Sequence, residues 1–188
     1  KTFRPLETKG IDTGMGLERL AMVAQRKNNI FETDLFTSIT AFLEHEISTG
    51  IPERYQRIIT DHARGITFLL ADDVLPDKKG RGHILRRLIG RSSSHLIAHR
   101  YFAKSNEGES IPTKNYFSQP LEGVIGKVID EYSKVEAYSY LSDKRAHILR
   151  VVTDEYGRYS ETHIKIEKKL TKLFSEARDN DSFKLTGR

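Results

Sequence analysis

Apolar residues recur every three or four positions along most of the chain, a spacing that places them on one face of an α-helix. The clearest stripe comprises Tyr55, Ile58, Ile59, Ala63, Ile66, Leu69 and Leu70. Residues 50–52, 72–82 and 104–119 interrupt the pattern with Gly, Pro, Ser or Asn, and the last of them is expected to be a surface loop. The pattern predicts a mainly α protein, with helices over residues 17–26, 33–48, 53–71, 83–103 and 120–137 and a long last helix through 152–177.

Two of these helices carry further signals. Thr33 stands where its hydroxyl could cap the N-terminus of the second helix. The last helix has a heptad-like stripe, a pattern typical of helices that pack on partner helices. The stripe consists of Val152, Tyr156, Tyr159, His163, Ile166, Leu170, Leu173 and Ala177.

A short motif near the N-terminus, Asp12-Thr13-Gly14-Met15-Gly16-Leu17-Glu18-Arg19, suggests a ligand site. A β-type segment, Lys9–Ile11, leads into the motif, and a helical pattern follows it. The two glycines permit a tight turn and a close approach of the backbone to a ligand. We therefore expect a strand, a glycine turn and the start of a helix, in that order.

The charged residues of this motif could hold two different groups. The Asp12 carboxylate can hold an ammonium group, and the Arg19 guanidinium can hold phosphate oxygens. One site for both suits an amino acid beside a nucleotide. The alternative is a purely structural turn, and the dinucleotide fingerprint fits poorly because Arg19 occupies the place of its third glycine.

The octapeptide resembles the third signature motif of the alanyl-tRNA synthetases, a class II family. Further blocks of the chain resemble that family in the same order and spacing, from about Lys9 to Arg91. These blocks are Asn29–Phe36, Thr60–Gly65, Phe68–Asp72, Val74–Pro76, Gly80–Gly82 and Leu85–Arg87. Several blocks in the right order are more specific than any single motif.

The resemblance implies roles for four residues of the first motif. Asp12 would contact the amino group of alanine, and Gly14 would line the same pocket. Gly14, Gly16 and Arg19 would bind ATP, with Arg19 as the catalytic group that meets phosphate. ATP and Mg²⁺ would be the cofactors of the whole enzyme, with no metal site in this segment.

The resemblance also implies how the chain is divided. Residues 1–28 would close the catalytic domain with the last strand and helix of its sheet. Residues 29–188 would form a helical domain that receives the acceptor stem of tRNA(Ala). The family's first two motifs would precede Lys1, so we expect a fragment of a longer alanine–tRNA ligase, inactive alone. The expected compartment is the cytoplasm, with the mitochondrial matrix as the alternative.

A basic block supports contact with nucleic acid. No Asp or Glu occurs from Lys78 to Lys104, whereas eight lysines and arginines do: Lys78, Lys79, Arg81, Arg86, Arg87, Arg91, Arg100 and Lys104. Such a charge repels itself unless a partner neutralises it, and a phosphate backbone is the obvious partner. The alternative is a solvated helix whose arginines pair with Asp72, Asp73 or Glu107.

By resemblance this block meets the tRNA acceptor stem, and the contacts expected there are Lys78, Lys79, Arg81, Arg86, Arg87 and Arg91. The glycines of Gly80–Gly82 could bring backbone close to phosphates. The block also departs from the family pattern. Lys78 replaces an asparagine that helps to distinguish a G·U wobble pair, and Gly90 replaces an arginine. An ammonium group only donates hydrogen bonds, so it suits the minor-groove pattern of donors and acceptors less well than an asparagine amide does.

Composition narrows the remaining possibilities. The chain has no cysteine, a formal charge of +5 and no apolar run of about 18 residues, so disulfides and a membrane span are not expected. His95 and His99 have the i, i+4 spacing of metal ligands but lack the accompanying glutamate, and Asp61-His62 is expected to be structural. The rival functions are a non-catalytic helical RNA-binding module and a nucleotide hydrolase, and no water-activating base is visible for the latter.

Overall fold

The computed structural model describes residues 4–46, 51–105 and 119–179, and within these the side chains of 46, 99–105, 119–120, 167, 171 and 174–179 are left aside. The chain forms two compact units, Lys1–Ser38 and Ile39–Arg188. The domain boundary expected after residue 28 concerns a whole synthetase and stays a prediction. No helix among the described residues is long and apolar enough to cross a membrane.

The first unit begins with an extended segment and continues with one helix and one 3-10 turn. Residues 4–16 adopt neither helix nor strand, α1 spans Leu17–Ala24 and η1 spans Ile30–Glu32. Helix α1 confirms the first helix expected from the sequence. No strand occurs in the described residues, and the strand expected at Lys9–Ile11 as part of a catalytic sheet stays a prediction.

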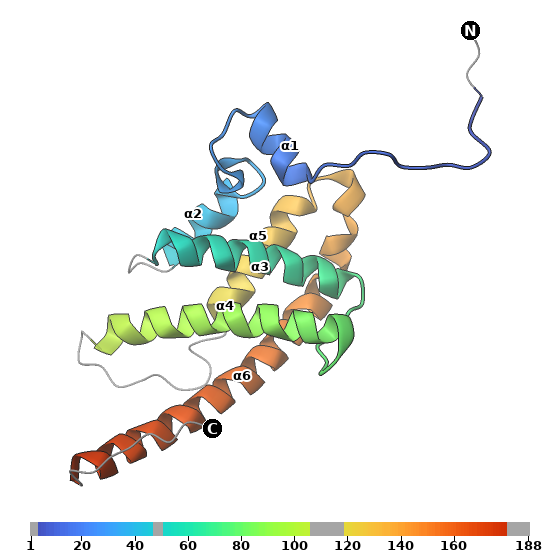
Figure 1. The fold of residues 1–188 in the computed structure, drawn as a ribbon. Helices are drawn as coiled ribbons and strands as arrows, with labels where there is room; N and C mark the ends of the chain where they lie inside the picture. The colour runs from blue at the N-terminus through green and yellow to red at the C-terminus, as the bar shows by residue number, and fades with distance from the viewer. Residues whose placement is uncertain (1–3, 47–50, 106–118, 180–188) are drawn as a thin grey trace. The chain divides into compact units, whose positions relative to one another are not determined.

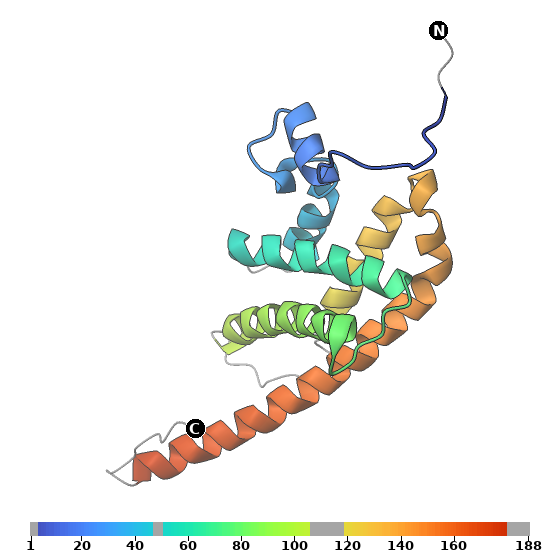
Figure 2. The same ribbon diagram turned by 45° about the vertical axis from the view of Figure 1, so that its right-hand side comes forward.

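The second unit is a helical bundle. Figures 1 and 2 show α3 and α4 side by side and antiparallel, and α6 packs on both of them and on α5. The C-terminal half of α6 extends past the other helices in both views. The elements of the bundle are α2 (Thr37–Glu46), α3 (Glu53–Ala71), α4 (Gly80–Ser105), α5 (Gln119–Tyr132), η2 (Glu136–Tyr138) and α6 (Tyr140–Asp179).

The apolar stripe of α3 forms the centre of the core. Ile59, Ala63, Ile66 and Leu70 are each fully buried, and they recur at the helical spacing seen in the sequence. Leu85 and Ile89 of α4, Val124, Ile125 and Val128 of α5, and Ile148, Val152 and Tyr156 of α6 complete it. The mainly α class is therefore confirmed.

Helix α3 ends in a turn that sets the direction of the next segment. Asp73 adopts a φ of 58°, and the N–H groups of Asp73 and Val74 donate to the carbonyls of Leu70 and Leu69 at 3.1 and 3.0 Å. This is the hydrogen-bond pattern of a Schellman motif. Val74 is buried beside it, which anchors the connection that leads to α4.

Three expectations about the helices were wrong in detail. The Thr33 hydroxyl donates to the Ile30 carbonyl at 2.6 Å instead of capping a helix, and α2 begins only at Thr37. The helix expected over residues 120–137 ends at Tyr132. The heptad stripe of α6 is buried at Val152 and Tyr156, whereas Ile166 is 55% exposed and Leu170 is 43% exposed. The surface loop expected at 104–119 lies almost entirely outside the described residues.

Candidate functional site

The residues of the first motif lie on the surface of the first unit. Asp12, Gly14 and Gly16 belong to the extended segment, and Arg19 lies in the first turn of α1, where its N–H donates to the Gly16 carbonyl at 3.1 Å. All four residues are exposed. The backbone N–H and C=O groups around Gly14 are accessible as well, because a Cβ at that position would meet nothing within 4 Å.

The tight glycine turn predicted within this motif is not formed. Residues 9–16 contain no turn, and Gly16 has an extended conformation with a φ of −61° and a ψ of 134°. Gly16 is instead the N-cap of α1, a position where glycine is tolerated and no side chain caps the helix. The motif therefore presents its carboxylate and its guanidinium from an extended strand-like segment and a helix start.

The glycines of Gly80–Gly82 close the connection between α3 and α4. Gly80 has a φ of +57°, a conformation that glycine adopts without strain. Gly82 is buried, and a Cβ there would lie 2.4 Å from the Leu75 carbonyl oxygen and 2.8 Å from the Asp77 nitrogen. The local backbone conformation and packing thus account for both glycines, whereas the sequence had suggested that they bring the backbone close to phosphates.

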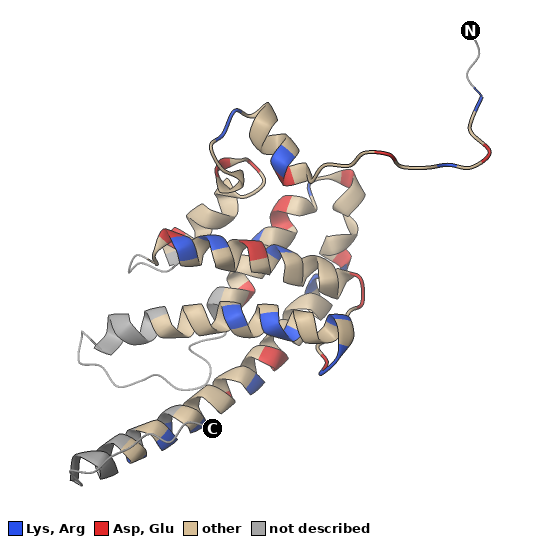
Figure 3. Ribbon diagram, viewed as in Figure 1, with Lys and Arg blue, Asp and Glu red and all other residues tan. Residues whose placement is uncertain are grey.

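The basic block begins in this connection and continues along α4. The six cations expected to contact RNA are all exposed: Lys78, Lys79, Arg81, Arg86, Arg87 and Arg91. Figure 3 shows their charge along the N-terminal part of α4, where no acidic residue occurs. The side chains of Arg100 and Lys104 lie outside the description. The block is thus an exposed cationic surface as far as Arg91, and the expected contact of its residues with RNA stays a prediction.

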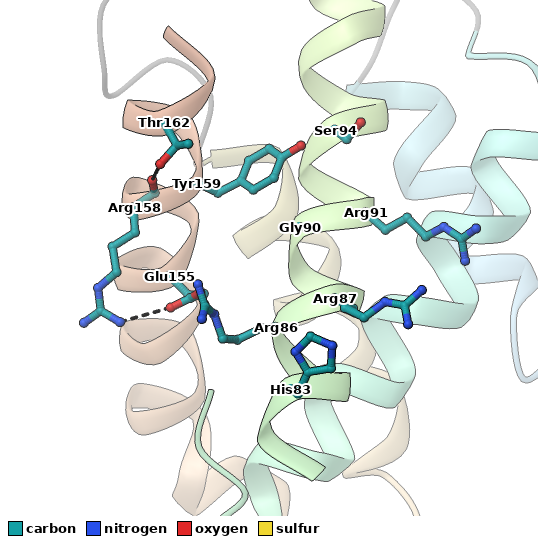
Figure 4. Close-up of a pocket in the computed structure, with 10 residues that line it drawn as sticks. All are labelled: His83, Arg86, Arg87, Gly90, Arg91, Ser94, Glu155, Arg158, Tyr159 and Thr162. Carbon is teal, nitrogen blue, oxygen red and sulfur yellow. Dashed lines mark hydrogen bonds and ion pairs between the residues drawn. The ribbon is translucent and has the colours of Figure 1, made fainter. Parts of the chain in front are cut away.

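One of these arginines has a protein partner that the sequence did not reveal. Arg86 Nε donates to Glu155 Oε1 at 2.8 Å, and Arg158 Nη1 donates to Glu155 Oε2 at 3.0 Å (Figure 4). Glu155 is only 6% exposed, so its carboxylate is neutralised by these two arginines within α4 and α6. Among the acids named as alternative partners, Asp73 pairs with Lys144 at 3.1 Å, and Glu107 lies outside the described residues.

A groove of about 670 Å³ runs between α4 and α6 beside this cluster. Its walls carry Arg87 and Arg91 from α4 and Arg158 from α6. Tyr159 reaches from α6 towards α4 with its hydroxyl on the side of Ser94 (Figure 4). The groove is therefore cationic, and its lining includes the phenol ring of Tyr159 and the imidazole ring of His83.

Gly90 makes room for that ring. A Cβ at Gly90 would lie 3.3 Å from Tyr159 Cε2, so the ring lies directly against the backbone of α4. At the position where the family pattern has an arginine, this chain thus has a glycine with the ring of Tyr159 from α6 packed against it. Sequence reasoning placed Tyr159 on the apolar stripe of α6, and nothing in the sequence connected it with Gly90, which lies 69 positions earlier.

His95, one of the two histidines considered as metal ligands, has another role in the described structure. The His95 ring stacks on Tyr55 of α3, with 4.6 Å between ring centroids. Burial, reinforced by the positive charge of Arg91, lowers the pKa of His95 below its ordinary value. No group of three metal-ligating side chains occurs among the described residues, and the side chain of His99 lies outside them.

Asp61 and His62 form a local pair on the surface of α3. His62 Nδ1 lies 3.3 Å from Asp61 Oδ2, and this hydrogen bond lowers the pKa of the Asp61 carboxyl. His62 is mostly covered by its surroundings, while Asp61 is exposed. A charged carboxylate bonded to a neighbouring ring suits the structural role expected for the pair, which stays a prediction.

Comparison with known proteins places these features in a family. The family model for class II tRNA synthetases (A) matches residues 1–187. The alanine–tRNA ligase of Clostridioides difficile (strain 630) is 39% identical over 164 residues, which cover 84% of this chain and 16% of the relative.

Two further relatives match almost the entire chain. The alanine–tRNA ligase of Pelotomaculum thermopropionicum is 36% identical over 98% of this chain and 20% of its own length. That of Ligilactobacillus salivarius (strain UCC118) is 32% identical over 100% of this chain and 20% of its own length. The chain thus spans about a fifth of the length of such relatives. Since the family model covers nearly every residue, the chain belongs to the class II (A) family of tRNA synthetases.

Proposed function

We propose that this chain is part of an alanine–tRNA ligase, which activates alanine with ATP and transfers it to tRNA(Ala). The observation that carries the proposal is the match of 84–100% of the chain to proteins of that name. The motif from Asp12 to Arg19 and the cationic face of α4 supply the two kinds of surface that such an enzyme needs, one for small substrates and one for RNA.

In this proposal the first unit contributes to the site for alanine and ATP. Asp12 holds the ammonium group of alanine, and Gly14 lies beside it. Arg19 binds phosphate oxygens of ATP and offsets the negative charge that develops there during activation. Gly16 starts the helix that carries Arg19. The exposure of the Asp12 carboxylate and the Arg19 guanidinium is compatible with both roles, and Mg²⁺ accompanies ATP with no residue of this chain assigned to it.

The face of α4 and the connection before it bind the acceptor stem. Arg87 and Arg91 lie one helical turn apart, about 6 Å along the helix axis, which suits successive phosphates of one strand. Lys78, Lys79 and Arg81 extend the same cationic surface. Arg86 belongs to it with a smaller contribution, because Glu155 already offsets its charge.

Kinetics of the whole protein test the small-molecule site. Asp12→Ala should lower kcat/KM for alanine, and Arg19→Ala should lower it for ATP, each by about tens- to several-hundredfold for a lost charged contact. The assay is alanine-dependent exchange of pyrophosphate into ATP, and Glu7→Ala in the same exposed segment is the control. Unchanged alanine kinetics in Asp12→Ala would remove that residue from the alanine pocket.

Salt dependence tests the RNA surface in the 188-residue chain. Each phosphate contact contributes about 0.9 to the slope of log affinity against log salt. Replacing Arg87 and Arg91 with alanine should therefore flatten the slope for an acceptor-stem hairpin by up to about two units. The matched control removes two lysines that pair with Glu131 on α5, Lys127 and Lys134, and should leave the slope unchanged.

The non-catalytic RNA-binding module is the outcome to distinguish. It predicts salt-dependent hairpin binding by the chain together with a whole protein that shows no alanine-dependent exchange. The ligase requires both activities. An equal loss of slope in the two double variants would argue against α4 as the RNA surface and leave its arginines as a solvated helix face.

A further inference from the structure

The groove between α4 and α6 has an aromatic ring where a purely electrostatic surface needs none. Tyr159 is only partly exposed, yet it lines the groove and does not belong to the fully buried core. One side of its ring lies against Gly90, where no side chain intervenes. The ring is therefore held against α4 while it remains part of the groove surface.

The salt-bridge cluster beside the ring fixes its position. Glu155 precedes Tyr159 by one helical turn and binds Arg86 of the facing helix, so it joins α6 to α4 at this level. Arg158 binds the second oxygen of the same carboxylate. Because the carboxylate is neutralised, it does not repel a phosphate, and the groove keeps the net positive charge of its other arginines.

Two cations of α4 lie before and after the residue against which the ring packs. Arg87 and Arg91 flank position 90 in sequence, and both line the groove with Tyr159. In Figure 4 the guanidinium groups of Arg87 and Arg91 extend to the side of α4 away from α6, so a strand held by either arginine would cross α4 to bring a base to the ring. Aromatic side chains bind unpaired bases by stacking, whereas bases within an A-form duplex are not available for it.

We propose that Tyr159 is a stacking platform for an unpaired base of the RNA that α4 binds, with Arg87 and Arg91 holding the adjacent phosphates. The inference rests on the proposed RNA-binding function of α4 and adds a preference for a single-stranded nucleotide. An acidic peptide would use the arginines of the groove but would gain little from the ring.

Two hairpins with the same stem test this proposal in the 188-residue chain, one with a blunt end and one with a short single-stranded 3′ tail. Wild type should bind the tailed hairpin more tightly. Tyr159→Leu should weaken binding of the tailed hairpin by about five- to a hundredfold, the range for loss of one stacked base, and leave the blunt hairpin and the salt slope unchanged. Tyr159→Phe keeps the ring and should bind like wild type.

A fluorescent base provides a second measurement, made on the wild-type chain alone. With 2-aminopurine at successive tail positions, one position should be quenched when wild type binds. For the binding assay with Tyr159→Leu, circular dichroism should show that this variant retains its helices. Equal weakening of both hairpins by Tyr159→Leu, the same loss in Tyr159→Phe, or no quenched position would overturn the stacking role. Competition by polyglutamate that depends on Tyr159 would favour a peptide and overturn it too. If wild type binds neither hairpin, both the stacking role and the proposed RNA-binding function of α4 are refuted. If wild type binds the blunt hairpin and Tyr159→Leu binds the tailed hairpin as tightly as wild type does, only the stacking role is refuted.

Discussion

Replacing Gly82 with alanine should destabilise the second unit, although the change puts a better helix former into a helix. Gly82 lies in the first turn of α4 and packs against the connection that follows α3. A Cβ at this position would lie 2.4 Å from the Leu75 carbonyl oxygen, 2.6 Å from Asp77 Cβ and 2.8 Å from the Asp77 nitrogen. Two of these three atoms belong to the backbone, so rotation of a side chain does not relieve the contact.

Two opposing terms set the size of the effect. Alanine is favoured over glycine by about 1 kcal/mol in a helix interior. Forcing one extra carbon into a close-packed site costs about 1–3 kcal/mol, and backbone contacts this short fall at the upper end of that range. The net loss expected for Gly82→Ala is therefore about 2 kcal/mol in the free energy of unfolding, a large part of the stability of a typical domain.

Urea unfolding of the 188-residue chain, followed by circular dichroism, measures this difference. The matched control is Gly157→Ala in α6, where a Cβ would meet nothing within 4 Å. Gly157→Ala gains the higher helix propensity of alanine without a steric clash, so its free energy of unfolding should rise by about 1 kcal/mol. A Gly82→Ala variant at least as stable as wild type would refute the reasoning. The same variant should weaken hairpin binding, because the displaced connection carries Lys78 and Lys79.

Two further predictions concern pH and RNA specificity. Burial lowers the pKa of His95 below its ordinary 6.5, so the unfolded chain binds this proton more readily and stability should be lost as the pH falls below about 6.5. His95→Phe keeps the ring on Tyr55 and should reduce that loss in urea titrations at pH 7.5 and 5.5; an identical loss would exclude His95 as its source. Lys78→Asn should raise the preference for a G·U-bearing stem over its G·C counterpart, measured with matched hairpins, since an amide both donates and accepts; an unchanged ratio would contradict this.

The helices could be predicted from the sequence wherever one apolar face is buried. Ile59, Ala63, Ile66 and Leu70 are a case of this kind, because their spacing in the sequence is also their arrangement in the core. The same reasoning overestimated the stripe of α6, since periodicity shows that residues share a face but not that another element covers it. Ile166 has the correct spacing and is nevertheless 55% exposed.

Helix ends were predicted less well because they depend on a few local hydrogen bonds. Threonine is a residue type favoured at helix N-caps, yet the Thr33 hydroxyl donates to the Ile30 carbonyl. Asn29 caps the 3-10 turn that immediately precedes Thr33. Asp73 adopts a positive φ that its residue type does not require. A threonine or an aspartate can form several local hydrogen bonds of similar energy, and only the packed structure selects one of them.

The basic block shows most clearly why a list of charged residues does not define a binding surface. Arg86 and Arg87 are adjacent in the sequence and equivalent in composition, but they point to different surroundings on α4 (Figure 4). Arg86 meets a buried carboxylate 69 positions away, whereas no ion pair of Arg87 is found within the described part of the chain. A phosphate that binds Arg86 must compete with Glu155, and one that binds Arg87 competes only with water and salt. Replacing Arg87 with alanine should therefore change the slope of log affinity against log salt more than replacing Arg86 does. This difference arises from Glu155 on α6 and not from the sequence of the basic block.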